Sequence, residues 1–184
     1  AFFAYGADAG QEAAARALGS LAFVVTNRSA IADAGGIDPL VALVRSGAAG
    51  GQEAAAAALA WLAYDAAANR SAIADARGIP PLVALVRNGA ARGQKWAAAA
   101  LRNLASDNAA NKGAIAAAGG IVPLVALVTN GAAGDREQAA GAFGNLACNR
   151  RVPRVSPVLP RTNYRQAWEQ RENSQMPKPG IYDH

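Results

Sequence analysis

The chain has little of what catalytic and metal-binding sites usually need. Its 184 residues include one cysteine, Cys148, and one histidine, His184, at the last position. One cysteine excludes an internal disulfide and a cysteine-rich metal site, and a terminal histidine is hard to hold in a catalytic arrangement. The sequence also has no phosphate-binding loop, no nucleophile elbow and no carboxylate pair at helical spacing in an apolar segment. We therefore predict no enzyme activity, no metal and no cofactor.

Aromatic and charged residues are scarce too, at 6 % and 17 % of the chain, whereas 52 % of the residues are hydrophobic. Much of that hydrophobic fraction is alanine, which is the strongest helix former and buries little area per residue. The composition therefore favours thin, closely packed helices over a β-sandwich or a doubly wound sheet. No apolar run is long enough to span a membrane and no signal peptide heads the sequence. We expect no transmembrane segment and an intracellular location, whether cytoplasmic, nuclear or organellar.

The charge of the chain is unevenly distributed. Residues 1–149 carry 11 Lys and Arg against 10 Asp and Glu, whereas residues 150–184 carry 7 against 3. The net charge of +5 therefore lies mainly in the final segment. Because a nucleic-acid-binding surface needs clustered basic residues, this balance argues against such a surface on residues 1–149.

Internal repetition is the strongest signal in the sequence. The segment IADAGGI begins at Ile31, IADARGI begins at Ile73 and IAAAGGI begins at Ile115, which gives a period of 42 residues. Each copy is followed by a PLVALV segment and then by an alanine-rich segment that ends in Leu-Ala. One further alanine-rich copy, QEAAARALGSLA, begins at Gln11 without the two segments that precede it elsewhere. The chain therefore contains three repeats and one lone third segment.

Each repeat predicts three helices. The first is short, Asn69 or Ser71 can cap its N-terminus, and it ends at a glycine corner before Ile79, where glycine tolerates a sharp turn. The second opens with a proline such as Pro81, where a missing N–H costs nothing, and ends at a glycine. The third is the longest, and its alanines allow neighbouring repeats to pack closely. The lone third helix is expected from about Asp8 to Val25, and no strand is expected.

These features resemble the armadillo-repeat family, the solenoids typified by importin-alpha and beta-catenin. The shared features are the 42-residue period, the glycine between the first and second helices, the PLVALV run and the Asn-Leu-Ala ending. HEAT repeats are the nearest rival, but they lack the short first helix and the double-glycine corner. The resemblance covers about residues 8–149 and implies an all-α fold, a right-handed α-solenoid of one lone third helix and three repeats over residues 1–149. Members usually have more repeats, so we expect a short or truncated member.

The resemblance also implies where a partner binds. In the family, the third helices line a concave groove in which an asparagine ladder holds the backbone of an extended peptide. The ladder position falls on Asn103 and Asn145, whereas the earlier equivalents are Trp61 and Ser20. The tryptophan that importins carry one turn before the asparagine is replaced by alanine or glycine. A nuclear-import receptor is therefore the weaker interpretation.

Side chains on the same helix face complete the predicted surface. Residues four or seven positions before the ladder share its face, and an asparagine amide offers a donor and an acceptor to any peptide group. Large aromatic side chains commonly anchor interfaces. The predicted partner-binding residues are Arg16, Trp61, Trp96, Asn103, Gln138 and Asn145. Two alternatives stay open: the tryptophans only pack against neighbouring repeats, or the asparagines only bond to backbone carbonyls within the stack.

The final segment, residues 150–184, is basic and rich in proline, and the repeat pattern stops before it. It predicts an extended tail with one short helix over residues 162–173. Three valines are spaced by three, as on one side of a polyproline II ribbon, and we expect them to cover the end of the last repeat in place of a further repeat. The predicted tail contacts are Val152, Val155, Val158 and Trp168. The alternative places the valines on another protein.

The sequence therefore predicts a non-catalytic protein-interaction scaffold or adaptor, or an accessory subunit docked in a larger assembly. Its partners would be other proteins, bound through the third-helix groove and the basic tail. The alternative is a peptide receptor of the nuclear-import or signalling type, in which the tail occupies the groove as a pseudo-ligand. The two interpretations differ in what the tail touches: other chains in the first, Asn103 and Asn145 in the second.

Overall fold

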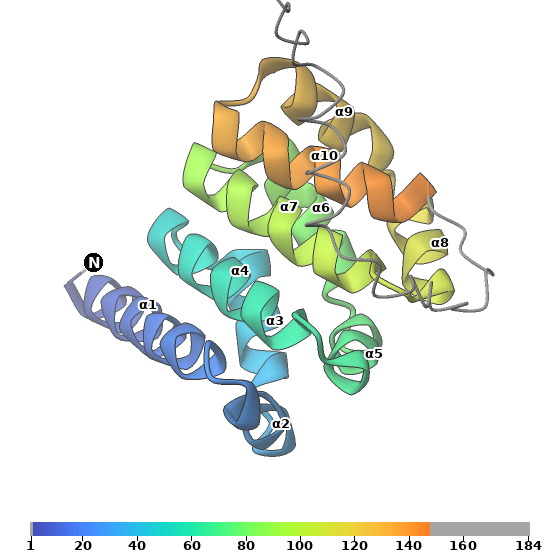
Figure 1. The fold of residues 1–184 in the computed structure, drawn as a ribbon. Coiled ribbons are helices and arrows are strands. Elements are labelled where there is room, and N and C mark those ends of the chain that lie inside the picture. The colour runs from blue at the N-terminus through green and yellow to red at the C-terminus, as the bar shows by residue number, and fades with distance from the viewer. Residues whose placement is uncertain (1, 148–184) are drawn as a thin grey trace, which may run out of the picture. The chain divides into compact units, whose positions relative to one another are not determined.

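The computed structural model describes residues 2–147, with side chains from residue 8 onward. These residues form ten α-helices and no strand, which confirms the predicted all-α class. Helix α1 (Phe2–Ala22) belongs to no triplet, and three triplets of helices follow it in the chain (Figure 1). The chain divides into two units, Ala1–Asn149 and Arg150–His184. The predictions for the tail lie outside the described residues: Val152, Val155, Val158, Trp168 and the helix over 162–173.

Each triplet consists of a nine-residue first helix, a ten-residue second helix and a fifteen-residue third helix. The first helices are α2 (Val25–Asp33), α5 (Ala67–Asp75) and α8 (Ala109–Ala117). The second helices are α3 (Ile37–Ser46), α6 (Ile79–Asn88) and α9 (Ile121–Asn130). The third helices are α4 (Ala49–Ala63), α7 (Ala91–Ala105) and α10 (Ala133–Ala147). The predicted order and relative lengths are confirmed.

The third helices form one layer. Helices α1, α4, α7 and α10 lie side by side, and each contacts the next (Figure 1). Each second helix packs against the third helix of its own repeat and against neighbouring second helices. Helix α1 packs on α4 as α4 packs on α7, so the predicted lone third helix is confirmed. It spans Phe2–Ala22, so it begins and ends earlier than the expected range of about Asp8 to Val25. It ends earlier because Val25 already begins α2.

Alanine makes the close approach between third helices feasible. Eight alanines of α4 and α7 are completely buried: Ala55, Ala56, Ala58, Ala63, Ala97, Ala98, Ala100 and Ala105. The largest fully buried side chains include Leu59, Leu82, Leu101 and Ile115. Because no long side chain separates two alanine faces, the helices can approach closely, and the leucines fill the remaining core. The alanine-rich third segments therefore pack as their composition predicts.

The corner between the first and second helices needs glycine for two different reasons. Its first residue has a positive φ, +76° at Gly35 and +56° at Arg77. This conformation costs a residue with a Cβ roughly 1–2 kcal/mol, so Arg77 holds a strained position that glycine fills in the first repeat. The second residue, Gly78, has an ordinary φ of −73°, but a Cβ there would lie 2.8 Å from Cγ2 of Ile73 and 2.9 Å from its carbonyl oxygen. The second glycine is therefore required by close packing.

The predicted caps of the first helices are wrong. Helix α5 begins before both Asn69 and Ser71, and no side chain caps its N-terminus. Asn69 is 5 % exposed, and its amide donates to the carbonyl oxygens of Leu62 at 3.0 Å and of Arg28 at 3.1 Å. The amide of Asn111 makes the equivalent pair of bonds one repeat later. Each asparagine therefore satisfies one carbonyl group in the last turn of the third helix before it. Its second bond reaches the first helix of the preceding repeat, so it joins successive repeats.

Candidate functional site

Two hollows open on the layer of third helices, and together we call them the third-helix groove. The larger, of about 800 Å³, is lined mainly by residues of α1, α4 and α7. The smaller, of about 310 Å³, is lined mainly by residues of α4 and α7, with Gln138 of α10. Both share the side chains of Trp61, Lys95 and Trp96, so the two hollows adjoin one another there.

Five of the six predicted partner-binding residues line this groove: Arg16, Trp61, Trp96, Asn103 and Gln138. They come from four successive third helices, and the structure brings them to one surface. Asn145 is half-buried on α10 and does not line either hollow. The helical spacing from which these residues were predicted therefore places side chains of different repeats next to one another.

Aromatic rings form the walls of the groove. The ring centroid of Trp61 is 5.1 Å from that of Phe23, 6.2 Å from that of Tyr64 and 6.4 Å from that of Trp96. We call these four residues the aromatic cluster. Phe23 and Tyr64 meet Trp61 edge to face, a geometry worth about 0.5–1.5 kcal/mol per pair beyond buried area. The two tryptophans also pack against the core, whereas Phe23 and Tyr64 are 65 % and 52 % exposed. The core therefore holds the two tryptophans of the cluster in place, whereas Phe23 and Tyr64 remain open to solvent.

Phe23 and Tyr64 line the groove but were not among the predicted partner-binding residues. Each is the first residue after a Leu-Ala ending, so their shared place in the repeat could have indicated that they lie on the same surface. The next repeat has Ser106 at this place. Arg28 is 4 % exposed and holds Tyr64 in place. Its Nη1 donates to the Tyr64 carbonyl oxygen at 2.7 Å, and its guanidinium carbon lies 5.3 Å from the centroid of the Tyr64 ring. A buried arginine of α2 therefore positions one wall of the groove.

Both ladder asparagines bond within the stack. Nδ2 of Asn103 donates to the carbonyl oxygen of Ala60 at 2.9 Å, and Nδ2 of Asn145 donates to that of Arg102 at 2.8 Å. Each acceptor lies in the last turn of the preceding third helix, where carbonyl groups lack partners within the helix. An amide has two N–H donors and an acceptor oxygen. Each asparagine therefore has this structural role and, within residues 8–147, still keeps one N–H and its oxygen for a peptide backbone.

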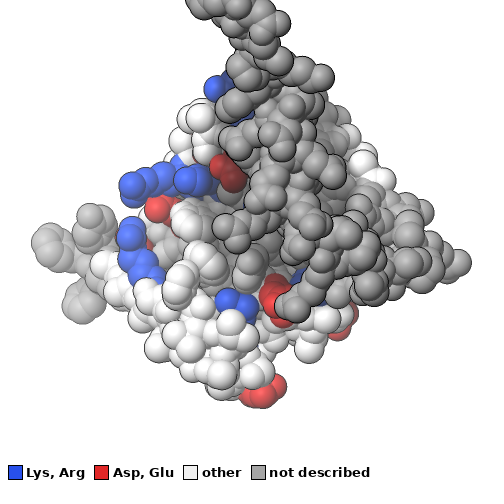
Figure 2. Space-filling model, viewed as in Figure 1, with Lys and Arg blue, Asp and Glu red and all other residues white. Residues whose placement is uncertain are grey.

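Three basic side chains line the larger hollow, and two of them have acidic partners. Nη2 of Arg16 lies 2.8 Å from Oε1 of Glu12, and Nη1 of Arg92 lies 3.7 Å from Oε1 of Glu53. Figure 2 shows Lys and Arg side chains gathered at the left of the viewed face, with Asp and Glu side chains beside them. Exposed pairs of this kind contribute little to stability, but they leave Lys95 as the one cation of this hollow without a carboxylate partner among residues 8–147.

The smaller hollow keeps its positive charge. Among residues 8–147, neither Lys95 nor Arg102 forms an ion pair with a carboxylate. Nη1 of Arg102 donates instead to the neutral amide oxygen of Gln138 at 3.2 Å. A Cβ on Gly141 would lie 2.7 Å from Cδ and Nε of Arg102. Gly141, at the position where importins carry a tryptophan, therefore leaves space for the side chain of Arg102.

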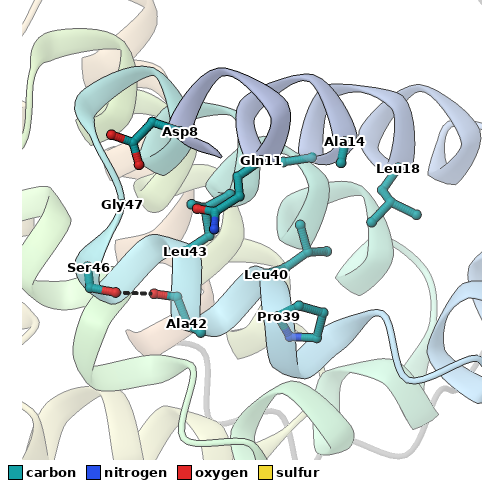
Figure 3. Close-up of a pocket in the computed structure, with 11 residues that line it drawn as sticks. Asp8, Gln11, Ala14, Leu18, Pro39, Leu40, Ala42, Leu43, Ser46 and Gly47 are labelled. Carbon is teal, nitrogen blue, oxygen red and sulfur yellow. Dashed lines mark hydrogen bonds between the residues drawn. The ribbon is translucent and has the colours of Figure 1, made fainter. Parts of the chain in front are cut away.

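A further hollow, of about 320 Å³, lies between α1 and α3 (Figure 3). Its residues Leu43 and Ser46 correspond to Leu85 and Asn88 in a smaller hollow between α3 and α6. In that second hollow Val44 of the preceding second helix supplies part of the wall, but α1 has no such helix in the described residues. The hollow in Figure 3 therefore lies on a side of α3 that faces no other second helix in the described residues.

The described helices hold neither a cluster of metal ligands nor a single long apolar span. Residues 2–147 contain no group of three or more His, Cys, Asp and Glu side chains that could hold a metal ion. No single helix in this range is long and apolar enough to cross a membrane, and α8 and α9 reach that length and composition only as a pair bent by 83°.

The described residues thus form an α-solenoid of helix triplets with a groove on its layer of third helices. The model of the armadillo/beta-catenin-like repeat matches residues 26–63 and 67–106. The chain therefore carries armadillo repeats, and its fold is the armadillo solenoid. The third triplet, residues 109–147, lies outside the match but repeats the same order of helices.

Solved structures share this fold. An engineered protein is 38 % identical, with a TM-score of 0.73 over 76 % of this chain and 57 % of that one. A computationally designed armadillo repeat protein for modular peptide recognition is 26 % identical, with a TM-score of 0.69 over 73 % and 57 %. A designed armadillo repeat protein in complex with the peptide (KR)4 is 23 % identical, with a TM-score of 0.67 over 73 % and 57 %. The chain spans little more than half the length of these three proteins. No curated protein sequence gives a significant match.

Proposed function

We propose that this chain is a non-catalytic protein-interaction scaffold or adaptor that holds an extended segment of a partner protein in the third-helix groove. The aromatic cluster is the observation that supports this most directly, because exposed aromatic side chains around a hollow are typical of interface anchors. Phe23 and Tyr64 leave more than half of their surfaces open to such a partner. Armadillo repeats typically bind proteins or peptides, and one of the similar structures was designed for modular peptide recognition.

The asparagine amides support an extended partner. Asn103 keeps one N–H and its side-chain oxygen beyond the bond to Ala60, and together these can pair with one peptide group. A helical partner has already used its backbone groups in its own hydrogen bonds. An extended segment still offers its N–H and C=O groups, so it fits an amide ladder better.

The alternative, a receptor whose own tail fills the groove, has weaker electrostatic support. Residues 150–184 carry seven basic and three acidic side chains. Lys95 and Arg102 give the smaller hollow the same sign of charge. Like charges repel in the partly desolvated setting of a groove. We therefore assign the groove to a separate protein chain.

A display library of random short peptides tests this proposal with the whole chain as bait. Peptides selected on the wild-type chain should bind the variants Trp61→Ala and Trp96→Ala more weakly by about 1–3 kcal/mol each, as at interface hot spots. The matched control is Val122→Ala, which removes an exposed apolar side chain outside the groove, 75 % exposed on α9. Circular dichroism checks that each variant keeps its helix content.

Two results would overturn the proposal. One is that the selected peptides bind the double variant Trp61→Ala, Trp96→Ala as tightly as the wild-type chain. The other is that Val122→Ala weakens binding as much as the groove variants do.

A further inference from the structure

We infer that the segment held in the groove is acidic and carries a large apolar side chain next to its carboxylates. This inference rests on the proposed function and adds the chemistry of the partner. It is carried by the smaller hollow, where aromatic walls and two positive charges without carboxylate partners meet.

The apolar part follows from the walls and floor of this hollow. Trp61, Tyr64 and Trp96 form its walls, and two small residues, Ala60 and Ala99, lie between them. Its volume of about 310 Å³ is at the lower end of the ~300–1,000 Å³ that ligand pockets usually have. A hollow of this size with ring walls suits one aromatic or large aliphatic side chain.

The acidic part follows from Lys95 and Arg102. Both are half-buried, and both lie against glycines of α10: a Cβ on Gly134 would be 3.3 Å from Nζ of Lys95, and one on Gly141 would meet Arg102. A charge held at a partly buried site interacts more strongly than one in bulk water. A carboxylate entering the hollow would therefore gain two partners, whereas a lysine or arginine would meet two like charges.

The distribution of charge also orients the segment. Glu12 and Glu53 already neutralise Arg16 and Arg92 in the larger hollow. The two cations of the groove without acidic partners among residues 8–147, Lys95 and Arg102, thus both lie on α7 and not on α1. The acidic residues of the partner should therefore contact the α7 and α10 end of the groove.

Three labelled synthetic peptides test the inference by fluorescence anisotropy with the whole chain. In the first, aspartates flank a phenylalanine; in the second, alanine replaces that phenylalanine; the third is (KR)4, the peptide bound by the designed armadillo protein. The first should bind at least about tenfold more tightly than either other peptide, and its affinity should fall as salt rises, because salt screens charge.

Charge-reversal variants sharpen the test. The double variant Lys95→Glu, Arg102→Glu should bind the acidic peptide about tenfold more weakly or worse and bind (KR)4 more tightly than the wild-type chain. The gain for (KR)4 also shows that the variant is folded. Arg45→Glu makes the same change on the exposed side of α3, outside the groove, and should change neither affinity.

The outcomes separate this inference from the proposed function. If (KR)4 binds as tightly as the acidic peptide and Trp61→Ala weakens both, the groove binds peptides but the acidic assignment is wrong. If none of the three peptides binds while library-selected peptides do, the acidic assignment is also wrong. If the library yields no peptide either, both the assignment and the proposed function fail.

Discussion

The second helices of the middle and last repeats have nearly the same sequence and different surroundings. They read IPPLVALVRN in α6 and IVPLVALVTN in α9. Ile79 and Val83 of α6 are 3 % and 2 % exposed, whereas the matching Ile121 and Val125 of α9 are 45 % and 47 % exposed. Helix α6 is followed by α9 in the stack, but no second helix follows α9 in the described residues. Position in the stack, more than local sequence, thus sets which apolar residues are core, as expected where repeats contact only their neighbours.

The largest expected effect comes from one substitution made in both repeats. Ile79→Ala should lower the free energy of unfolding by about 2–5 kcal/mol, because it empties a packed site. Ile121→Ala should lower it by less than about 1 kcal/mol, because its side chain is already half exposed. Urea unfolding followed by circular dichroism measures both. Equal losses would contradict the difference in burial and would favour the predicted covering of this end by Val152, Val155 and Val158.

A smaller difference in the free energy of unfolding is expected between alanine substitutions of two asparagines at the same repeat position. The buried amide of Asn69 bonds to two carbonyl oxygens of preceding elements, whereas that of half-buried Asn27 bonds to Leu21 alone, at 3.1 Å. Asn69→Ala should therefore cost about 1–3 kcal/mol and Asn27→Ala about 0.5–1.5 kcal/mol. Thermal melts of the two variants rank these costs. A lower melting temperature for Asn27→Ala than for Asn69→Ala would show that the asparagine bonds do not join the repeats as described.

The same substitution at two glycines should change the stability of the chain in opposite directions. Gly113 lies inside α8, where an added Cβ meets nothing within 4 Å, so Gly113→Ala should stabilise the chain by about 0.5–1 kcal/mol. At Gly78 the same change forces a Cβ onto Ile73, so Gly78→Ala should destabilise it by about 1–3 kcal/mol. Melting temperatures that shift in the same direction for both variants would contradict the packing account of the corner.

Much of the fold could be predicted because the repeat occurs three times in the sequence. The 42-residue period, the prolines in the second helices and the alanines in the third placed every triplet. Helical spacing then placed Trp96 and Asn103 on one face, where both line the groove. The exact start of each helix was harder to predict from the sequence. Asn69 is of a residue type that caps helices, but its amide bonds to a carbonyl oxygen of the preceding repeat instead.

The remaining features of the groove depend on neighbours that no single repeat contains. Tyr64 becomes a wall residue because the loop after α4 turns it towards Trp61 and Arg28 holds it there. The charge of the smaller hollow depends on which cations find acidic partners, and those partners lie elsewhere in the fold. Arg92, for example, pairs with Glu53 of the preceding third helix. Such pairings across repeats cannot be read from spacing within one repeat.

The central claim is that the third-helix groove holds the partner, and the tryptophan side chains test it directly. A proton–nitrogen correlation spectrum of the labelled chain resolves one indole N–H signal from each of its three tryptophans, which single substitutions assign. Adding a library-selected peptide should shift the signals of Trp61 and Trp96, together with the side-chain amide of Asn103, more than any others. Trp61 and Trp96 signals that stay in place at saturation, while signals from α3 or α9 move, would contradict the groove as the binding site.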